Sequence, residues 1–454
     1  MLYAQNMPEM DPDTQVTIGS VYIIGNKKTR DEIILRELDI EAGRTFSAAQ
    51  LKEILVLDQQ KLMNTRLFIA VEIVPLFTTS NQAEVLVRVI ERWYIFPVPI
   101  FKLADRSFTE WWVNQKRDFS RVNYGLQLQH MNLTGRNDKM SIRAQFGFTK
   151  QFALQYQIPY VNKAQTIGLN FSTSYSNNKT VSYASSGHRQ LFLESEDELR
   201  NNFSIGSGLN FRPNFYNRHS FSLFYGRNNV SEELRQLNPS YLSSLGNTQN
   251  YFAMSYTFRH DRRDFISYPL TGRIFEFSAQ QIGLGVFNDV DMFTGRASYA
   301  TFNALGKKLY LANGAEVYQN FAERIPYLFR SGFGYHPDIL RGYDLYVIET
   351  DFLFSYRSSL KFELIKGVKE LNPRSVIDQF RSLPYAAYLK IFFDAGFAGD
   401  ALRNNENNFL NNSWIGSMGI GLDIVTYYDF VMRFEYSINK EGDTGFFFNF
   451  RSAL

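Results

Sequence analysis

The sequence predicts a mainly β protein, a sixteen-stranded antiparallel transmembrane β-barrel preceded by one small α+β domain. Three observations predict this fold class. From Trp93 onward, strand after strand alternates apolar and polar residues, with turns rich in Asn, Asp, Gly and Pro between them. Phe, Tyr and Trp make up 16% of the 454 residues, as expected for the two interfacial girdles of a membrane barrel. The apolar stretches are far shorter than the roughly 18 residues of a spanning helix, so helical membrane proteins are excluded.

The composition excludes several classes of protein. With 48 basic and 45 acidic residues the formal net charge is +3, which gives no electrostatic reason to expect nucleic acid as a partner. The absence of cysteine excludes disulfide frameworks, thiolate metal sites and cysteine nucleophiles. A mean hydropathy of −0.27 suits a barrel whose strands alternate between lipid and lumen. On composition alone, a soluble aromatic-rich β protein remains an alternative.

The first 92 residues have the pattern of a small domain. We expect residues 1–13 to be a flexible N-terminus or a signal remnant, because the start of the chain is too short for a signal peptide with a charged beginning and an apolar core. Residues 14–92 follow the order strand, helix, helix, strand, strand. The expected elements are a strand at 16–24, a helix at 29–38, a helix from an N-cap at Ser47 to residue 64, and strands at 68–77 and 83–92.

Residues 93–454 are expected to form the barrel. In Val122–His130 and Met140–Phe148 one face is mainly apolar and the other mainly polar. A soluble sandwich also has one apolar face per strand, but sixteen strands in series without an intervening helical region favour a closed barrel with an even strand number. The expected strands start near Ile95, Val122, Met140, Gln151, Thr166, Asn201, Ser220, Tyr251, Arg273, Asp289, Lys308, Thr350, Tyr385, Trp414, Phe430 and Thr444.

The connections between these strands are uneven, as in membrane barrels with short turns at one end and long loops at the other. Tight turns are expected at 134–137 and 427–429. Long connections are expected at 179–198, 231–247, 322–347, 366–383 and 400–412. The segments 322–347 and 366–383 are the longest irregular candidates, and long loops in compact domains are usually functional or disordered.

The front domain resembles a single POTRA module. The segments that carry this resemblance are Ile24-Gly25-Asn26-Lys27-Lys28-Thr29, Gly43 and Leu67-Phe68-Ile69-Ala70-Val71. With the barrel behind it, the chain resembles the POTRA–β-barrel superfamily of bacterial outer-membrane proteins, the bacterial surface antigen family that includes BamA, TamA and the two-partner secretion transporters. The resemblance implies a Gram-negative outer membrane, with the POTRA domain at 14–92 in the periplasm and the barrel at 93–454. Assembly factors of this superfamily have several POTRA modules, whereas here we expect one.

A second resemblance lies in a strand and the turn after it. The segment Arg259-His260-Asp261-Arg262-Arg263-Asp264, followed by Tyr268-Pro269-Leu270-Thr271-Gly272, resembles the superfamily's strand–turn signature. A polar strand end followed by a Pro/Gly turn would explain the turn, but not the combination. The residues assigned to this signature are Asp261, Arg263, Asp264, Pro269 and Gly272.

The strongest resemblance is Leu340-Arg341-Gly342-Tyr343, which matches the Arg-Gly-aromatic tip of the long loop that folds back into the lumen after strand eleven. About fifty residues on, Phe392, Asp394 and Gly396 match the Phe-x-Asp-x-Gly motif of strand thirteen. A guanidinium inside a barrel needs an acceptor, and a carboxylate supplies one with fixed geometry. We therefore predict that Arg341 contacts Asp394 or its immediate surroundings.

The ends of the barrel sheet suggest a weak closing seam. The first strand contains Pro97 and Pro99, which cannot donate to a ladder. The last strand, with Phe446, Phe448 and Phe450, would close on it. A weak seam would ease lateral opening of the barrel. The alternative is that the two prolines precede the true start of the strand.

The sequence contains little that points to catalysis. It has no Gly-x-Ser-x-Gly elbow, no phosphate-binding glycine loop and no paired-histidine zinc motif. Its five histidines are scattered, and His260 beside Asp261 reads as a polar strand residue. We expect no enzyme activity, no catalytic residues, no metal and no cofactor.

The resemblance implies assistance in the insertion or transport of outer-membrane proteins. The alternatives are a dedicated protein or lipid transporter, or a structural barrel subunit that works with a separate partner; an outer-membrane lipase or a passive pore ranks behind them. Expected partners are the lipid bilayer with its lipopolysaccharide, and unfolded or partner proteins at an edge of the strand pair 68–77 and 83–92. A homo- or hetero-oligomer is also an open expectation.

Overall fold

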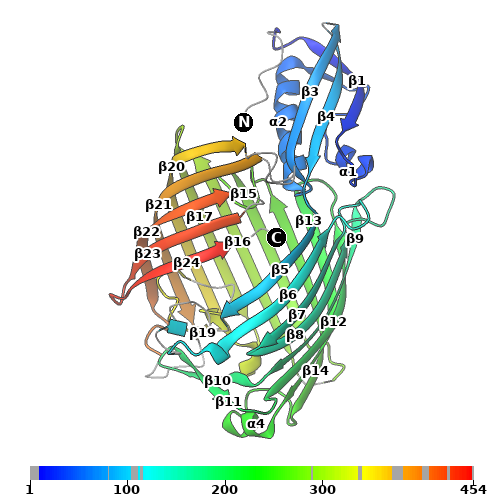
Figure 1. The fold of residues 1–454 in the computed structure, drawn as a ribbon. Helices are drawn as coiled ribbons and strands as arrows, with labels where there is room; N and C mark the ends of the chain where they lie inside the picture. The colour runs from blue at the N-terminus through cyan, green and yellow to red at the C-terminus, as the bar shows by residue number, and fades with distance from the viewer. Residues whose placement is uncertain are drawn as a thin grey trace.

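The computed structural model describes residues 10–79, 81–103, 111–112, 116–287, 290–335, 340–370, 382–400, 408–426 and 430–451. A small α+β domain sits at one end of a large antiparallel barrel (Figure 1). We call this end of the barrel the domain end. Within the described ranges, no helix is both long and apolar enough to span a membrane.

The α+β domain packs two helices on a four-stranded sheet. The sheet order is β2-β1-β4-β3. Its elements are β1 (Gln15–Ile24), α1 (Asp31–Leu35), β2 (Thr45–Ser47), α2 (Ala48–Asn64), β3 (Phe68–Thr79) and β4 (Gln82–Glu91). The structure adds the short strand β2 to the predicted elements and shortens the first helix. Strand β2 has three residues and forms through its pairing with β1, so the local sequence does not predict it.

Helix α2 begins and ends where the sequence predicts. The Ser47 hydroxyl accepts a hydrogen bond from the Gln50 backbone at 3.2 Å, and the Gln50 amide oxygen accepts one from the Ser47 backbone at 3.0 Å. This reciprocal capping box satisfies two backbone donors at the helix start. Leu51, Leu55 and Leu62 are buried in the core of the domain, as their helical spacing requires.

The edge expected of the strand pair 68–77 and 83–92 is that of β3. Strand β4 is paired with β3 on one side and, in parallel, with β1 on the other. It therefore lies inside the sheet and offers no edge, whereas β3 lies at the rim. The parallel pairing of β1 and β4 joins segments about sixty residues apart, which sequence alternation cannot reveal.

The barrel wall is a sixteen-stranded antiparallel sheet, which confirms the predicted fold class. Every strand starts within three residues of its predicted start. The strands are β5 (Ile95–Leu103), β6 (Val122–Met131), β7 (Lys139–Gly147), β8 (Thr149–Ile158), β9 (Ile167–Asn178), β12 (Arg200–Phe211), β13 (Asn217–Val230), β14 (Thr248–Asp261), β15 (Gly272–Ile282), β16 (Met292–Ala304), β17 (Leu309–Asn320), β20 (Phe352–Glu370), β21 (Ser382–Gly399), β22 (Trp414–Thr426), β23 (Phe430–Asn439) and β24 (Thr444–Arg451).

The outer and inner faces of the wall carry different kinds of side chain. Outward positions such as Leu126, Phe146 and Leu154 are apolar and exposed. Inward positions are mainly polar, and Arg143 donates to the Gln127 side chain on the neighbouring strand at 2.7 Å. An apolar outside and a polar inside are the arrangement of a membrane barrel and the reverse of a soluble one.

The sheet has two ends, β5 and β24, and within the described part of the chain no ladder joins them. Figure 1 shows the wall curling round from β5 to β24. Pro97 and Pro99 lie inside β5, opposite Leu128 and Leu126 of β6. The alternative that both prolines precede the strand is therefore wrong. An end strand tolerates proline because one of its sides has no neighbour to receive a hydrogen bond.

Several connections contain structure that the sequence did not predict. The connection 179–198 holds a hairpin of β10 (Thr180–Ser186) and β11 (Arg189–Glu194), and 231–247 holds the short helix α4 (Glu232–Leu237). The expected long connection at 366–383 is wrong at both ends, because β20 continues to Glu370 and β21 starts at Ser382. The expected turn at 427–429, and residues 401–407 of the connection 400–412, lie outside the described residues.

Candidate functional site in the barrel lumen

The long connection between β17 and β20 packs against the inside of the wall. It contains a short 3₁₀ turn (Tyr327–Phe329) and the strand pair β18 (Ser331–Phe333) and β19 (Ile348–Thr350); its residues 336–339 lie outside the described part. Leu340 and Tyr343 are buried in one apolar cluster with residues of β18, β19, β20, β21 and β22. The predicted tip of the loop is thus fixed to the wall by burial of its apolar side chains.

Arg341 makes the predicted contact with Asp394. Its Nε donates to Asp394 Oδ2 at 2.8 Å, and its Nη2 donates to Oδ1 of the same carboxylate. Its Nη1 lies 3.3 Å from the Ser359 hydroxyl and 3.4 Å from a Glu435 carboxylate oxygen. Asp394 is completely buried. A fork-to-fork pair of this kind fixes both position and orientation, so Arg341 ties the loop to β20, β21 and β23.

Each residue of the β21 motif has a separate physical role. The guanidinium of Arg341 stacks over the Phe392 ring, 3.9 Å from its centre, and such a cation–π contact adds to the ion pair. Gly396 leaves room for the loop, because a Cβ at this position would lie 2.7 Å from the ring of Phe333 in β18. Within the motif, the Asp394 carboxylate binds the edge of the Arg341 guanidinium and the Phe392 ring lies against its face. Gly396 leaves space beside them for the Phe333 ring of the loop.

Gly342 and Tyr343 complete the anchoring of the loop tip. Gly342 has φ +83, and a Cβ on it would meet the Ser417 side chain at 3.0 Å. Its carbonyl accepts a hydrogen bond from the Asn439 side chain at 3.0 Å. The Tyr343 hydroxyl donates to Glu441 in the turn between β23 and β24. A left-handed glycine is required here both for the turn and for the close approach to β22.

A wider ion network surrounds the predicted pair, and sequence reasoning did not assign it. Lys390 on β21 lies 2.6 Å from Asp423 on β22 and 2.8 Å from Glu435 on β23. Glu435 thus bridges Lys390 and Arg341. We call these three residues, with Asp394 and Asp423, the lumen network. The signal available in the sequence was the inward register of these charged residues, but which of them meet depends on the stagger between strands.

The strand–turn signature forms a tight, internally bonded turn between β14 and β15. Arg263 donates from Nε to Asp261 at 2.8 Å, and the Asp264 carboxylate accepts from the Leu270 backbone at 3.1 Å. Gly272 has φ +102, and a Cβ there would collide with the Arg262 carbonyl at 2.1 Å. The signature residues in this turn are Asp261, Arg263, Asp264, Pro269 and Gly272. The contacts of Asp261, Arg263 and Asp264, with the close approach at Gly272, stabilise the turn.

Tyr268 connects this turn to the lumen network and was not assigned from the sequence. Its hydroxyl donates to Asp423 at 2.8 Å, and Lys361 Nζ lies 4.1 Å from the centre of its ring. Tyr268 is buried. Because Asp423 also binds Lys390, the signature turn and the Arg341 loop belong to one connected set of polar contacts.

The α+β domain is fastened to turns at the domain end of the barrel. Glu37 accepts two hydrogen bonds from Arg212 of the turn between β12 and β13, both at 2.7 Å. The Asn64 side chain of α2 donates to the Asp264 carbonyl at 3.0 Å. The Arg30 backbone donates to the Gly135 carbonyl at 3.0 Å. Three separate turns therefore hold the domain, and none of these contacts has a signal in the sequence.

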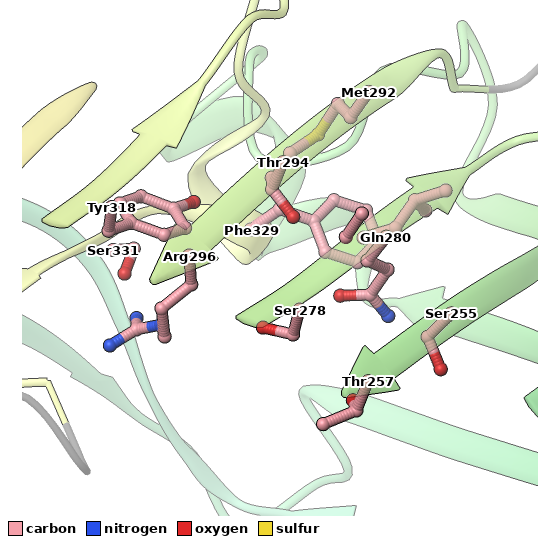
Figure 2. Close-up of a pocket in the computed structure, with 12 residues that line it drawn as sticks. Ser255, Thr257, Ser278, Gln280, Met292, Thr294, Arg296, Tyr318, Phe329 and Ser331 are labelled. Carbon is pink, nitrogen blue, oxygen red and sulfur yellow. The ribbon is translucent and has the colours of Figure 1, made fainter. Parts of the chain in front are cut away.

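A polar cavity of about 440 Å³ lies on the inner wall beside the loop. Figure 2 shows its lining, with hydroxyl and amide groups from β14, β15 and β16 and Phe329 and Ser331 from the loop. Arg296 lines it and is ion-paired with Glu316. Among the described residues, no group of His, Asp or Glu is arranged to hold a metal ion. The cavity suits water or a small polar solute.

Comparisons with known proteins agree with this architecture. Residues 132–348 match the Omp85 superfamily domain, and residues 16–92 match the POTRA model, described as a surface antigen variable number repeat. No curated protein matches the sequence.

Solved structures show the same fold. CdiB from Escherichia coli is similar at a TM-score of 0.58 and 10% identity, covering 96% of this chain and 76% of that one. BamA from Haemophilus ducreyi lacking POTRA domains 1–3 is similar at 0.54 and 14%, covering 96% and 83%. CdiB from Acinetobacter baumannii is similar at 0.51 and 12%, covering 96% and 73%.

Proposed function

We propose that this chain, in which a POTRA match precedes a match to the Omp85 superfamily domain, belongs to that superfamily and assists the insertion or translocation of proteins at the bacterial outer membrane, with its POTRA domain in the periplasm. The observation that carries the proposal is that, among the residues the structure describes, no ladder joins β5 and β24. A closed barrel has no edge, whereas a barrel with two unjoined strands can offer an edge to an incoming strand.

The geometry of β5 supports a weak seam. The Tyr94 carbonyl accepts from the Met131 backbone of β6, and successive residues of a strand direct their backbone groups to opposite sides. Even-numbered residues of β5 therefore bond to β6, and odd-numbered residues face the side of β24. Pro97 and Pro99 are odd-numbered, so two N–H donors are missing on the seam side. Each missing ladder bond removes about 0.5–1.5 kcal/mol of closing energy.

The lumen network gives the weak seam a rigid neighbour. Arg341, Lys390 and their carboxylate partners join β21, β22 and β23 inside the barrel, and Arg341 also donates to Ser359 of β20. Opening is therefore concentrated at the seam, while the adjacent wall keeps its register. The loop acts as a brace, and Arg341, Gly342, Tyr343 and Asp394 position the wall without taking part in chemistry.

Locking the seam tests this mechanism. Cysteine pairs at inward positions of the two strands, Val98 or Ile100 of β5 with Gly445 or Phe447 of β24, are expected to stop activity when oxidised and to restore it when reduced. The chain contains no cysteine, so no other disulfide interferes. A matched control places the pair at Val98 and Gln127, which face each other within the β5–β6 ladder. Full activity of an oxidised seam pair would remove lateral opening from the proposal.

Depletion of the protein followed by quantitative proteomics of the outer membrane tests the function itself. Broad loss of barrel proteins would support general insertion, and loss of one or two proteins would support dedicated transport. Altered lipids with an unchanged set of proteins would overturn the proposal in favour of lipid transport or of an enzyme.

A further inference from the structure

Strands β20 and β21 extend beyond their neighbours at the domain end. Leu309, the first residue of β17, pairs with Phe362, yet β20 continues for eight residues to Glu370. These residues pair with β21, ending at Glu370 opposite Ser382. At about 3.3 Å per residue the extension is roughly 26 Å long. In Figure 1 the arrow of β20 points toward the side where the POTRA domain lies. We call residues 363–370 and 382–388 the ribbon.

The two strands of the ribbon form a regular antiparallel pair. Its register is continuous from Ile365 opposite Ala387 to Glu370 opposite Ser382, with one bulge at Leu364. Tyr385 lies across Gly367, where a Cβ would come within 2.7 Å of the tyrosine hydroxyl. An aromatic ring over a glycine on the opposite strand is a device that stabilises strands. The part of the ribbon nearer the wall is also paired with β22, as at Ala386 opposite Val425. Among the described residues, the outer part at 367–370 and 382–385 has two strands only. Such a two-stranded ribbon is marginal in water, so a third strand would stabilise it.

The two edges of the ribbon differ. On the β21 side, the Pro384 carbonyl accepts from the Thr426 hydroxyl at 3.3 Å, so the backbone of Pro384 faces this edge and provides no N–H. On the β20 side, the bond from the Glu363 backbone to the carbonyl of Lys308, the residue before β17, is the last one to that neighbour among the described residues. From Leu364 to Lys369 this edge contains no proline, and among the described residues no strand pairs with it. One edge is blunted, and the other presents backbone donors and acceptors.

The side chains along the open edge are apolar and basic. Leu364, Ile365 and Val368 are exposed by 46%, 52% and 57%. Lys366 and Lys369 are exposed between and beside them. The neighbouring turn between β16 and β17 adds Lys307 and Lys308, which are also exposed. These four lysines outnumber the two glutamates at 363 and 370. Pairing with a second copy would bring lysine-rich edges together, which like-charge repulsion disfavours.

We propose that the β20 edge from Leu364 to Lys369 is a docking site for an extended segment of another polypeptide, apolar in its middle and acidic at its flanks. The segment adds a third strand to the ribbon, its backbone bonds to β20, and its acidic side chains meet the lysines. The site deepens the proposed function and rests on it for its location in the periplasm. It does not depend on the seam or on the POTRA edge.

Peptide binding to the purified full-length protein in detergent tests the site. The probe is a fluorescent peptide of eight alternating Val and Thr residues with two Asp residues at each end, measured by anisotropy. An otherwise identical peptide with N-methyl groups on its central residues cannot pair and is expected to bind at least tenfold more weakly. The double variant Lys366→Glu/Lys369→Glu is expected to lose at least tenfold in affinity. Lys52→Glu/Lys163→Glu changes two exposed lysines elsewhere by the same charge and is expected to bind as the parent does.

Disulfide mapping locates the bound strand. A peptide with one central cysteine is mixed with single-cysteine variants at positions 364 to 369, and with Leu383→Cys on the other strand as the control. Because a disulfide needs Cα atoms about 4.4–6.8 Å apart, only one or two positions of β20, and not 383, are expected to cross-link. Uniform cross-linking, equal binding of the methylated peptide, or unchanged affinity of Lys366→Glu/Lys369→Glu would overturn the proposal. Disulfide dimers of the chain alone would overturn it by assigning the edge to a second copy. Peptide binding is measured without any insertion activity, so its failure is distinct from a failure of the proposed function.

Discussion

Replacing Arg341 by Ala removes the cation from the lumen network, and the structure allows the cost to be estimated. Glu435 keeps Lys390 at 2.8 Å, whereas the ion pair of the completely buried Asp394 is with Arg341. Removing one partner of a buried pair leaves an uncompensated charge and typically costs 3–5 kcal/mol. We therefore expect Arg341→Ala to lower the free energy of unfolding by about 3–5 kcal/mol.

Urea unfolding of the refolded barrel, followed by tryptophan fluorescence and by heat-modifiable migration on gels, measures this change. Arg341→Lys keeps the charge but loses the two-pronged contact, so its loss should lie between those of the parent and Arg341→Ala. The double variant Arg341→Leu/Asp394→Leu should be more stable than Arg341→Ala, because it leaves no buried carboxylate at position 394. An Arg341→Ala protein within about 0.5 kcal/mol of the parent would refute the reasoning.

Three further predictions concern the lumen loop, the buried His188 between β10 and β11, and the domain junction. Gly396→Leu places atoms where the Phe333 ring lies, so the loop should leave the wall. Cleavage of the loop by a protease should then be at least tenfold faster, and an unchanged rate would contradict the packing of Phe333 against Gly396. Burial lowers the pKa of His188 below its usual 6.5, so the stability that neutral His188 contributes is complete above about pH 6.5 and is lost as the pH falls below it; the protection factors for amide hydrogen exchange around this residue, which are corrected for the intrinsic exchange rate, should therefore fall between pH 7.5 and 5, and His188→Gln should flatten that fall. Arg212→Ala removes both bonds to the buried Glu37 and should increase motion of the POTRA domain, measured as a broader spin-label distance distribution to the barrel; an unchanged distribution would show that the other turns suffice.

The sequence predicts the wall of the barrel well because each strand carries its own two-residue period. Strand starts depend on local alternation and on turn residues, and neither needs a partner strand. The Arg341–Asp394 contact was also predictable, because a buried guanidinium needs a carboxylate and the resemblance placed both residues on facing elements.

Features that depend on pairing partners could not be predicted. The position of β4 inside its sheet follows from the parallel pairing with β1, and the contacts of Lys390 and Tyr268 with Asp423 follow from strand stagger and from a turn folding inward. The ribbon was missed for a different reason. Gly367, Pro384 and the bulge at Leu364 interrupt the alternation, so a paired hairpin has the sequence pattern of a loop.

The turn between β14 and β15 has a mechanical consequence. One side of this ten-residue segment is bonded to Asn64 of α2, through the Asp264 carbonyl at 3.0 Å, and the other is bonded through Tyr268 to Asp423 in the lumen at 2.8 Å. A polypeptide that pulls on α2 from outside the barrel therefore loads the same short segment that holds the interior network. If the bond to Asn64 yields first, the domain keeps only its contacts with the other two turns; if the bond to Asp423 yields first, the brace inside the barrel loosens.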